Sequence, residues 1–334
     1  MSHKNVGPTA GPLKALLLAV ACTVCAVALP AKAQAPAYPT KPIRLVVPFA
    51  AGGSADVMGR AIAVELSKTY NQTVIVENRG GAGGNLGAEA VAKSPADGYT
   101  LLFGTIGIHA AYKIYPKLGY DPAKDLQAVN LLAELPNILI VHPGFAAQTL
   151  KDYMTLAAQQ PGTIFFGSAG NGSSTHMAGE LFKQVSKLEI KHVPYKGSSM
   201  ALTDLVGGQI QSMFENLPTA VAMVRSGKVR ALGVTSRERA PSLPNVPTML
   251  EAGLPGYEFT AWFTIAAPRG VPGPIINKLN ADIGTIMHSA VLAPKWAEQG
   301  VTPMRGDPAS AEAFFAAETK KWTAVIESQR LRVD

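Results

Sequence analysis

Cysteine is nearly absent from this sequence. The 334 residues contain two, Cys22 and Cys25, and both lie in an apolar N-terminal stretch. If that stretch is removed during export, the remaining chain has no thiol, which excludes a disulfide framework and a cysteine-ligated zinc site. The chain must then be stabilised by burial of apolar surface, and it is long enough to do so as two domains.

Long apolar runs, strong charge and metal-ligand spacings are also missing. No apolar run after residue 33 reaches the roughly 20 residues that a membrane-spanning helix needs. The formal net charge is +7, and loss of Lys4, Lys14 and Lys32 would lower it to +4. Because Lys and Arg are scattered, we expect no nucleic-acid partner. The histidines show no metal-ligand spacing, so we expect neither a metal nor a cofactor.

The N-terminus has the organisation of a secretory signal peptide. Lys4 and Lys14 precede an apolar run at residues 15–29, and the small-residue sequence AKA ends at Ala33. These are the basic, apolar and cleavage regions of such a peptide, so we predict that residues 1–33 are removed. The alternatives are a membrane anchor, for which the run is short, and a lipoprotein attached at Cys22, for which the expected upstream Leu is missing.

The segment LVVPFAAGGSADVMGR, at residues 45–60, has the pattern of a strand, a glycine loop and a helix. The apolar run ends at Pro48, and helical spacing begins at Ser54, predicting a helix over 55–69. Glycine lets the backbone approach a ligand closely, and the first N–H groups of a helix lie unpaired at its positive dipole end. Such a turn can bind a carboxylate or phosphate. The alternative is an ordinary connection with Ser54 as N-cap.

A second segment, at residues 163–185, repeats this pattern. Its apolar run ends in the loop GSAGNGSST, and the following helix places Met177, Leu181 and Val185 on one face. Two anion-binding turns, one in each half of the chain, predict a ligand held between two lobes. Another glycine-rich turn, at 77–87, lacks dinucleotide spacing, and we interpret it as a tight turn that shapes its lobe.

Strand-like and helix-like segments alternate along the chain. This alternation is typical of an α/β fold in which crossover helices join parallel strands. Ligands of such folds bind at the carboxyl ends of the strands. The C-terminal region has well-capped helices predicted at 274–287 and 308–326.

Two strands, at 138–141 and 258–265, have the positions expected of crossings between lobes. If they are crossings, the C-terminal helices rejoin the first lobe and the second lobe is an insertion. We therefore predict a first lobe formed by residues 34–138 and 258–334, and a second lobe formed by residues 139–257.

Catalytic groups in a known arrangement are not found. A nucleophile elbow requires Gly-x-Ser-x-Gly, whereas the run around Ser168 is FGSAG. His176 is a candidate base, but a histidine near a helix start is more often a solvated or capping residue. We expect that the protein is not an enzyme, with a secreted α/β hydrolytic enzyme as the alternative.

Five segments of the chain carry a resemblance to a known family. They are YPTKPIRLVVPFAAGGSADVMGR, VENRGGAGGNLGAEAVAKSPADGYTLLFG, HVPYKG, MFENLP and VRALGVTS. In this order they resemble the solute receptors of tripartite tricarboxylate transporters, the Bug or TctC-like family. The resemblance implies a periplasmic, two-lobed receptor of the type II binding-protein fold that captures a small mono- or dicarboxylate for a membrane permease. A ligand-presenting partner of a sensor protein is an alternative, and we expect a monomer.

The resemblance also implies that backbone amides of the two turns hold the ligand. With the ends of neighbouring strands, the predicted site comprises Phe49, Ala50, Gly52, Gly53, Ser54, Thr105, Ser168, Asn171, Gly172, Ser173, Thr175 and Glu215. Glu215 stands where many family members have Asp, and it would repel a carboxylate unless it is hydrogen-bonded elsewhere. Its alternative role is to tie its strand to the helix near Pro218.

Few other side chains are candidates for this site. Tyr195 and Trp262 are aromatic candidates at the cleft edge, with core packing as the alternative. Apart from Arg79, the strand-end loops carry no Arg or Lys. We therefore predict that helix N-termini and loop amides neutralise the ligand charge.

Overall fold

The structure is a computed structural model that describes residues 1–5 and 38–333. Most of the predicted signal peptide, with Cys22, Cys25 and the cleavage site after Ala33, lies outside the described residues. The strands and helices described below belong to the unit that begins at Lys41. Within the described ranges, no helix is both long and apolar enough to cross a membrane.

Strands and helices alternate along most of the chain, as predicted. The strands are β1 (Ile43–Val47), β2 (Val74–Asn78), β3 (Thr100–Thr105), β4 (Leu126–Val141), β5 (Phe165–Ser168), β6 (Lys191–Pro194), β7 (Ser212–Asn216), β8 (Arg230–Val234), β9 (Thr260–Pro268) and β10 (Thr302–Pro303). The α-helices are α2 (Ser54–Tyr70), α3 (Asn85–Ala92), α4 (Ile106–His109), α5 (Pro122–Asp125), α6 (Leu150–Gln159), α7 (Ser174–Ser186), α8 (Ser198–Val206), α9 (Leu217–Arg225), α10 (Gly273–Met287), α11 (Ala293–Glu298) and α12 (Pro308–Ser328). Two 3-10 turns are η1 (Ala82–Gly84) and η2 (Tyr112–Ile114).

The strands pair in the order β2-β1-β3-β9-β4-β7-β5-β6, and β8 and β10 both pair with β4. Strand β1 is parallel to β2 and β3, and β5 is parallel to β6 and β7. Strand β9 is antiparallel to β3 and β4, and β4 is antiparallel to β7. The prediction of parallel strands is therefore correct at both ends of the sheet and wrong at its centre. The cause is that β4 continues from the first half into the second, and that β9 runs opposite to both of its neighbours, β3 and β4.

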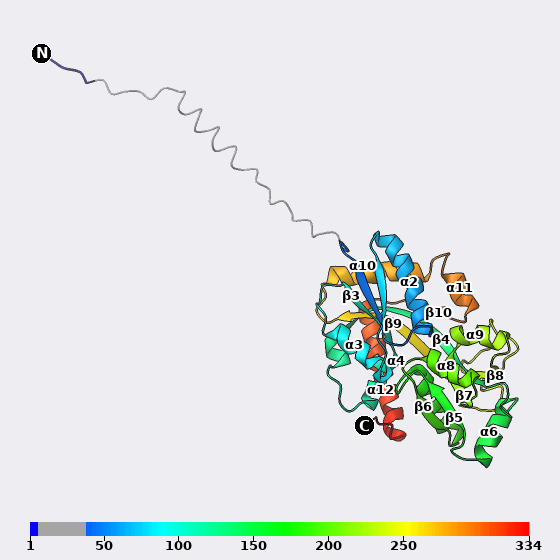
Figure 1. Ribbon diagram of the computed structural model, residues 1–334. Helices are drawn as coiled ribbons and strands as arrows, with labels where there is room; N and C mark the ends of the chain where they lie inside the picture. Colours follow the sequence, from blue (N-terminus) through cyan, green and yellow to red (C-terminus); the bar gives the residue numbers. More distant parts are fainter. Residues whose placement is uncertain (6–37, 334) are drawn as a thin grey trace. The chain divides into compact units, whose positions relative to one another are not determined.

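Strand β4 belongs to both halves of the sheet. Its first part, from Leu126 to Pro136, pairs with β9, and its second part, from Asn137 to Val141, pairs with β7. We call the half with β1, β2, β3, β9 and β10 the first lobe, and the half with β5, β6, β7 and β8 the second lobe. In Figure 1 the green elements of the second lobe gather on one side of β4.

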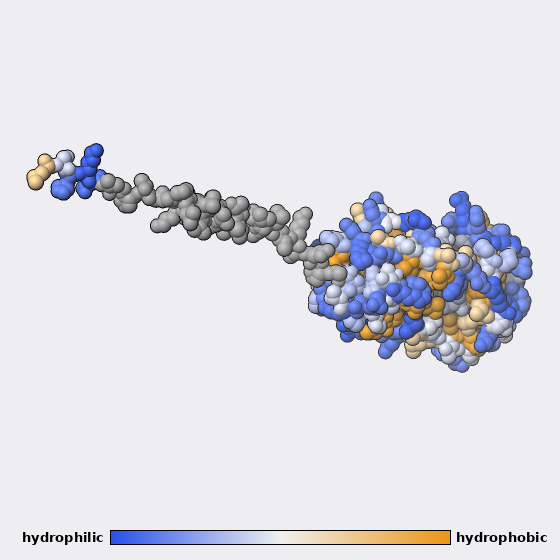
Figure 2. All heavy atoms as spheres, turned by 90° about the horizontal axis from the view of Figure 1, so that it is seen from above, coloured by the Kyte–Doolittle hydropathy of each residue, from blue (hydrophilic) through white to orange (hydrophobic). Residues whose placement is uncertain are grey.

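Each lobe has a buried apolar core of its own. Val46, Leu102 and Ala266 belong to a core cluster of the first lobe, whereas Met213 and Leu217 belong to a cluster of the second. On the face shown in Figure 2, hydrophilic residues cover much of the outline and apolar residues gather nearer the centre. No described residue is a cysteine, so in this part of the chain burial of apolar surface stabilises the fold without disulfides.

Two buried histidines predict sensitivity to acid. Burial lowers the pKa of His109 to about 3, and burial together with His176 and Lys183 lowers the pKa of His192 to about 2. An unfolded histidine has a pKa near 6.5, so the unfolded state binds more protons below that pH. The free energy of unfolding is therefore expected to fall as the pH drops from about 6.5 towards 3.

Urea unfolding of the wild type and of His109→Phe tests this expectation. Phenylalanine keeps the stacked contact with Phe315, whose ring centroid lies 4.2 Å from that of His109. Between pH 6.5 and 4.5 the variant should lose about 2 kcal/mol less stability than the wild type. Equal losses in the two proteins would contradict the assignment of a neutral, buried His109.

Candidate functional site

A small cavity lies between the two lobes. It is lined by Phe49, Gly53, Ser54, Ala55, Thr105 and Phe263 from the first lobe and by Ala169, Ser173, Ser174, Ser198 and Asn216 from the second. Its volume is about 20 Å³, which is room for about one water molecule. A ligand of several carbon atoms therefore requires the walls of this cavity to move apart.

The cavity lies at the N-termini of four helices, α2, α7, α8 and α9, and beside the single-turn helix α4. Gly53, Thr105, Ser173 and Asn216 are the N-cap residues of α2, α4, α7 and α9, and Ser198 is the first residue of α8. No side chain caps α2, α4, α8 or α9. The first N–H groups of a helix lack intrahelical acceptors and carry partial positive charge, so this convergence favours an anion. The residues around the cavity include no Lys or Arg.

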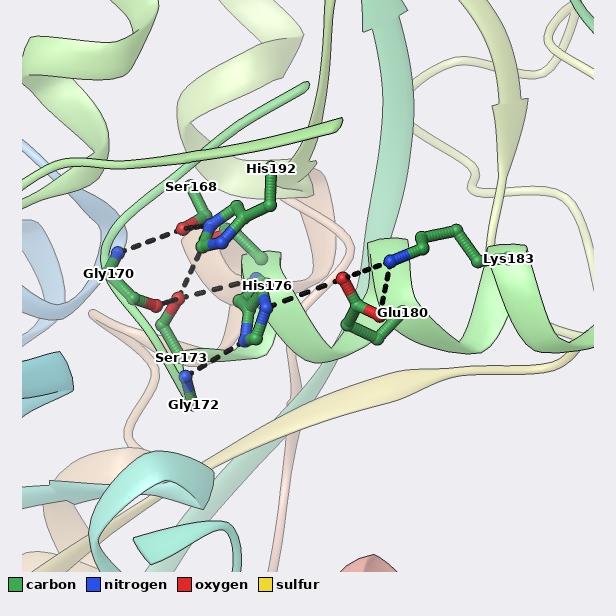
Figure 3. Close-up of polar contacts among 9 residues, drawn as sticks. Ser168, Gly170, Gly172, Ser173, His176, Glu180, Lys183 and His192 are labelled. Atoms are coloured by element: carbon green, nitrogen blue, oxygen red, sulfur yellow. Dashed lines mark hydrogen bonds and ion pairs between the residues drawn. The ribbon is translucent and has the colours of Figure 1, made fainter. Parts of the chain in front are cut away.

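The loop before α7 is held in shape by side chains of its own lobe (Figure 3). Three of its amides donate to side chains: Ala169 N–H to Thr175 Oγ1 at 2.8 Å, Gly170 N–H to Ser168 Oγ at 3.0 Å, and Gly172 N–H to His176 Nδ1 at 3.0 Å. These three amides are therefore occupied within the loop. In contrast, none of the hydrogen bonds described for the chain uses the N–H groups of Ser174 and Thr175 at the start of α7.

A buried row of charged and aromatic groups supports this loop (Figure 3). Lys183 Nζ lies 2.8 Å from Glu180 Oε2, and Glu180 Oε1 lies 3.5 Å from His176 Nε2. Burial acts to raise the pKa of Glu180, but His176 and Lys183 outweigh it and hold that pKa below its ordinary value. Because His176 Nδ1 accepts a loop N–H, its Nε2 is the ring nitrogen that faces Glu180 as a donor. His176 is not solvated, since its side chain is buried, but it accepts the Gly172 N–H at the start of α7 as a capping residue would.

Ser168 and His192 form a close pair that does not reach the cavity. Ser168 Oγ lies 2.6 Å from His192 Nε2, and the His192 ring stacks on that of His176 with centroids 4.0 Å apart. Ser168 is fully buried and is not part of the cavity wall. The pair therefore stabilises the loop and presents no nucleophile to a substrate in this conformation.

Hydrogen bonds between the lobes keep the cavity closed. They join Ala50 N–H to Lys196 O at 3.2 Å, Tyr115 OH to Asn171 O at 3.0 Å, Ser199 OH to Ala51 O at 2.8 Å, and the hydroxyls of Ser54 and Thr219 at 3.2 Å. Glycines permit this approach: a Cβ on Gly197 would lie 2.7 Å from the Cβ of Ala50. The lobes are thus in a closed arrangement.

The structure brings five of the predicted site residues to the cavity wall. They are Phe49, Gly53, Ser54, Thr105 and Ser173. Seven predicted residues lie outside the wall. Ala50 and Asn171 make contacts between the lobes, and the Gly52 N–H donates to Asp56. The other four are Ser168, Gly172 and Thr175, which take part in hydrogen bonds of the loop before α7, and Glu215, which lies at the end of β7. Most of these residues therefore shape the two turns instead of lining the space between them.

Glu215 is completely buried at the end of β7. Burial raises the pKa of its carboxyl group to about 7, and the hydroxyls of Thr219 and Ser198 and the N–H of Asn216 partly oppose this effect. The Thr219 hydroxyl donates to Oε1, so Glu215 does tie its strand to helix α9. This contact with the helix near Pro218 is the predicted alternative to ligand binding.

Two buried oxygen atoms beside the cavity have no hydrogen-bond partner of good geometry among the described residues. They are Thr105 Oγ1 and Glu215 Oε2. A buried polar atom without a partner costs free energy unless a ligand or water supplies one. Thr105 lines the cavity, and Glu215 lies directly behind its wall. Both oxygen atoms therefore indicate that the cavity binds a polar ligand.

Six further residues line the cavity. They are Ala55, Ala169, Ser174, Ser198, Asn216 and Phe263. Ala169 and Ser174 lie in the second predicted turn, and the other four were not named as site residues. A signal existed for Ser198 and Asn216, since each lies at the start of a helix that follows a strand and a loop. Phe263 gave no such signal because it lies within β9, not at a strand end.

The aromatic candidates lie outside the cavity wall. Trp262 is buried, stacks on Phe315 and donates its indole N–H to Glu318, so it is a core residue. The Tyr195 hydroxyl donates to Asp204 at 2.6 Å. In the part of the chain that the structure describes, no group of three or more His, Cys, Asp or Glu could hold a metal ion.

Known proteins match this chain over nearly its whole length. Residues 58–331 match the family described as "Tripartite tricarboxylate transporter family receptor". Protein BugT of Bordetella pertussis is 36% identical over 313 residues, which is 93% of this chain and 96% of BugT. The structure of R. palustris Rpa4515 with adipate is 40% identical with a TM-score of 0.85, covering 87% of this chain and 98% of that chain.

A second solved structure supports the same relationship. MatC from Rhodopseudomonas palustris with bound malate is 35% identical with a TM-score of 0.82, covering 86% of this chain and 100% of MatC. The predicted two-lobed α/β binding-protein fold is confirmed by these structural matches.

Proposed function

This chain belongs to the tripartite tricarboxylate transporter receptor family, and we propose that it captures a small mono- or dicarboxylate between its lobes. The family is periplasmic, and its members are solute-binding receptors, not enzymes. The observation that carries the proposal is the convergence of four helix N-termini on one cavity whose described lining residues include no basic side chain. The adipate of Rpa4515 and the malate of MatC support the ligand class.

In this proposal the unpaired amides of two turns hold the carboxylate. The N–H groups of Ser54 and Ala55 would act from the first lobe, and those of Ser174 and Thr175 from the second. Hydrogen bonds to a charged group are worth roughly 1.5–3 kcal/mol each, and a partly buried helix end adds up to about 2 kcal/mol. Micromolar affinity needs about 8 kcal/mol, so a few bonds from each lobe are sufficient.

Motion of the lobes is part of the proposal. The first lobe would comprise residues 34–138 and 258–334, and the second lobe residues 139–257. Two observations support these boundaries: β4 changes its pairing partner between Pro136 and Asn137, and β9 begins at Thr260. Hinge residues near 137–143 and 254–262 would let the lobes open to admit ligand. Ligand would then favour a closed form with a wider cavity than the one described above, because it would contact both lobes.

Export and partners complete the proposal. Residues 1–33 would act as a cleaved signal peptide, and the mature chain would work as a periplasmic monomer. Its partner would be the membrane permease of a tripartite tricarboxylate-type transporter, with a sensor protein as the alternative. Pull-down by the mature, ligand-loaded chain from detergent-solubilised membranes would distinguish a multi-span permease from a sensor.

Thermal unfolding of the mature chain in the presence of carboxylates tests the function. Ligand at a hundred times its Kd stabilises the folded state by about 2.7 kcal/mol, which raises the Tm by roughly 5 °C for a domain of this size. We expect this rise with at least one of adipate, malate and related small carboxylates, and none with their dimethyl esters. No rise with any carboxylate, together with turnover of an ester or amide, would favour the hydrolytic enzyme instead.

A further inference from the structure

The carboxyl group of Glu215 lies directly behind the wall of the cavity. Thr219 donates a hydrogen bond to Oε1, and the Thr219 hydroxyl also lies 3.2 Å from the hydroxyl of Ser54, a cavity residue. Two further cavity residues lie beside this carboxyl group. They are Asn216, the next residue of the chain, and Ser198, whose hydroxyl lowers the pKa of Glu215 by hydrogen bonding. An anion in the cavity would therefore be separated from Glu215 by single side chains.

No positive charge balances this carboxyl group among the described residues. Its neighbours are hydroxyl and amide groups, and no ion pair includes it. Charged or titratable groups on the surrounding elements are engaged elsewhere. In the second lobe, Lys183, Glu180 and His176 of α7 contact one another, His192 of β6 contacts Ser168, Asp204 of α8 contacts Tyr195, Arg225 of α9 contacts Ser242 and Glu298, and Arg230 of β8 contacts the carbonyls of Pro143, Phe145 and Ala147. On the elements of the first lobe, Glu134 of β4 lies beside Glu318 and Lys321, and Asp56 of α2 contacts Arg60 and Asn78. An ionised Glu215 would thus be a buried, unpaired charge.

We propose that Glu215 takes up one proton when the protein binds a carboxylate, so that anion capture is coupled to proton uptake. The inference rests on the proposed function. The proton comes from solvent and converts the carboxylate to the neutral acid, and Oε2, which has no hydrogen-bond partner of good geometry among the described residues, is the oxygen that receives it. Two like charges this close in a buried site repel strongly, and protonation removes both the repulsion and the cost of burying the charge.

The closed protein without ligand is poised for this step. Burial raises the pKa of Glu215 to about 7, and a bound anion would raise that pKa further. Above pH 7 the free protein is therefore increasingly ionised at Glu215 while the complex stays protonated. The Kd should rise with pH above 7, approaching tenfold per pH unit, and should be nearly constant below about pH 6.5.

Titration calorimetry with adipate, using the mature protein, measures the coupling. At pH 8.0, titrations in HEPES and in Tris, which differ in ionisation enthalpy, report the number of protons taken up per ligand. We expect between 0.5 and 1 proton for the wild type and none for Glu215→Gln, whose amide mimics the protonated acid and can still accept from Thr219. Between pH 7.0 and 8.5 the Kd should rise about tenfold for the wild type and less than twofold for the variant.

Glu134→Gln provides the matched control. Glu134 is half-buried in β4, its pKa is raised by burial and by Glu318, and it does not line the cavity. Its variant should take up protons as the wild type does. Adipate binding without proton uptake, or with the same pH dependence in wild type and Glu215→Gln, would overturn the inference and leave the proposed function intact.

A second measurement needs no ligand. The pKa of Glu215 is raised above that of an unfolded glutamate, near 4.3, so the wild type should lose stability relative to Glu215→Gln as the pH rises from about 4.5 to 7. Parallel unfolding curves for the two proteins would also overturn the inference. Failure of adipate, malate and the whole carboxylate panel to bind would instead overturn the proposed function.

Discussion

Replacing Gly53 by valine is expected to abolish carboxylate binding, whereas replacing Arg79 by alanine should leave it nearly unchanged. A Cβ on Gly53 would lie 2.8 Å from Ser198 Oγ, so the valine side chain would occupy the cavity at the start of α2. The backbone of Gly53, with φ −84° and ψ 171°, is compatible with valine, so folding should be retained. Loss of two hydrogen bonds to a charged ligand corresponds to a rise in Kd of at least about 100-fold.

Gly172→Val tests the second turn at a position outside the cavity wall, where a Cβ would face Ile114 and Ala111 of the first lobe. Gly172 has φ +79°, so valine adds backbone strain of about 1–2 kcal/mol to any effect on the ligand. Gly227→Val controls for that strain, because Gly227 has φ +69° and open space around it. Titration calorimetry should show weak binding for both turn variants and normal binding for Gly227→Val and Arg79→Ala. Loss confined to Arg79→Ala would show that a side-chain cation carries the site.

Replacing Gly83 by valine is expected to hold the lobes apart. A Cβ on Gly83, in η1 of the first lobe, would overlap the carbonyl oxygen of Asn171 in the second lobe. The clash is with backbone, so a change of rotamer cannot relieve it, and the Tyr115–Asn171 hydrogen bond would be lost as well. Overpacking should destabilise the closed state by about 1–3 kcal/mol relative to the open state. The apparent affinity for the carboxylate should then fall roughly 10- to 100-fold.

Small-angle scattering with and without adipate measures this effect. The wild type should become more compact on saturation with ligand, and Gly83→Val should not. Gly227→Val again controls for valine at a positive φ, since it has no neighbour to displace. A Gly83→Val protein that compacts and binds like the wild type would contradict the proposed role of lobe closure.

Local signals in the sequence were sufficient for the long helices α2, α10 and α12. The helix predicted at 55–69 is α2 (Ser54–Tyr70), and the helix predicted at 308–326 is α12 (Pro308–Ser328). Helix α2 follows a glycine loop, and α12 begins after Asp307, whose side chain accepts from Ser310 N–H, so both starts are set within one turn of chain. The antiparallel pairing of β4 and β9 could not be predicted in this way, because the partners are more than 100 residues apart and no local pattern fixes them.

The candidate site was predicted in part for the same reason. The rule that ligands bind at strand ends identified the turns before α2 and α7, which hold Gly53 and Ser173. It could not reveal that the Gly172 N–H is occupied by His176 Nδ1, because that contact depends on how the buried histidine is oriented. The unpaired Oε2 of Glu215 likewise follows from three-dimensional packing alone.

Amide nuclear magnetic resonance of the mature protein during titration with adipate tests the central claim most directly. If helix N-termini hold the carboxylate between the lobes, the amide signals of Ser54, Ala55, Ser174 and Thr175 should shift together, with one binding constant and one ligand per chain. Shifts confined to one lobe, or saturable binding that leaves these four amides unchanged, would contradict the account.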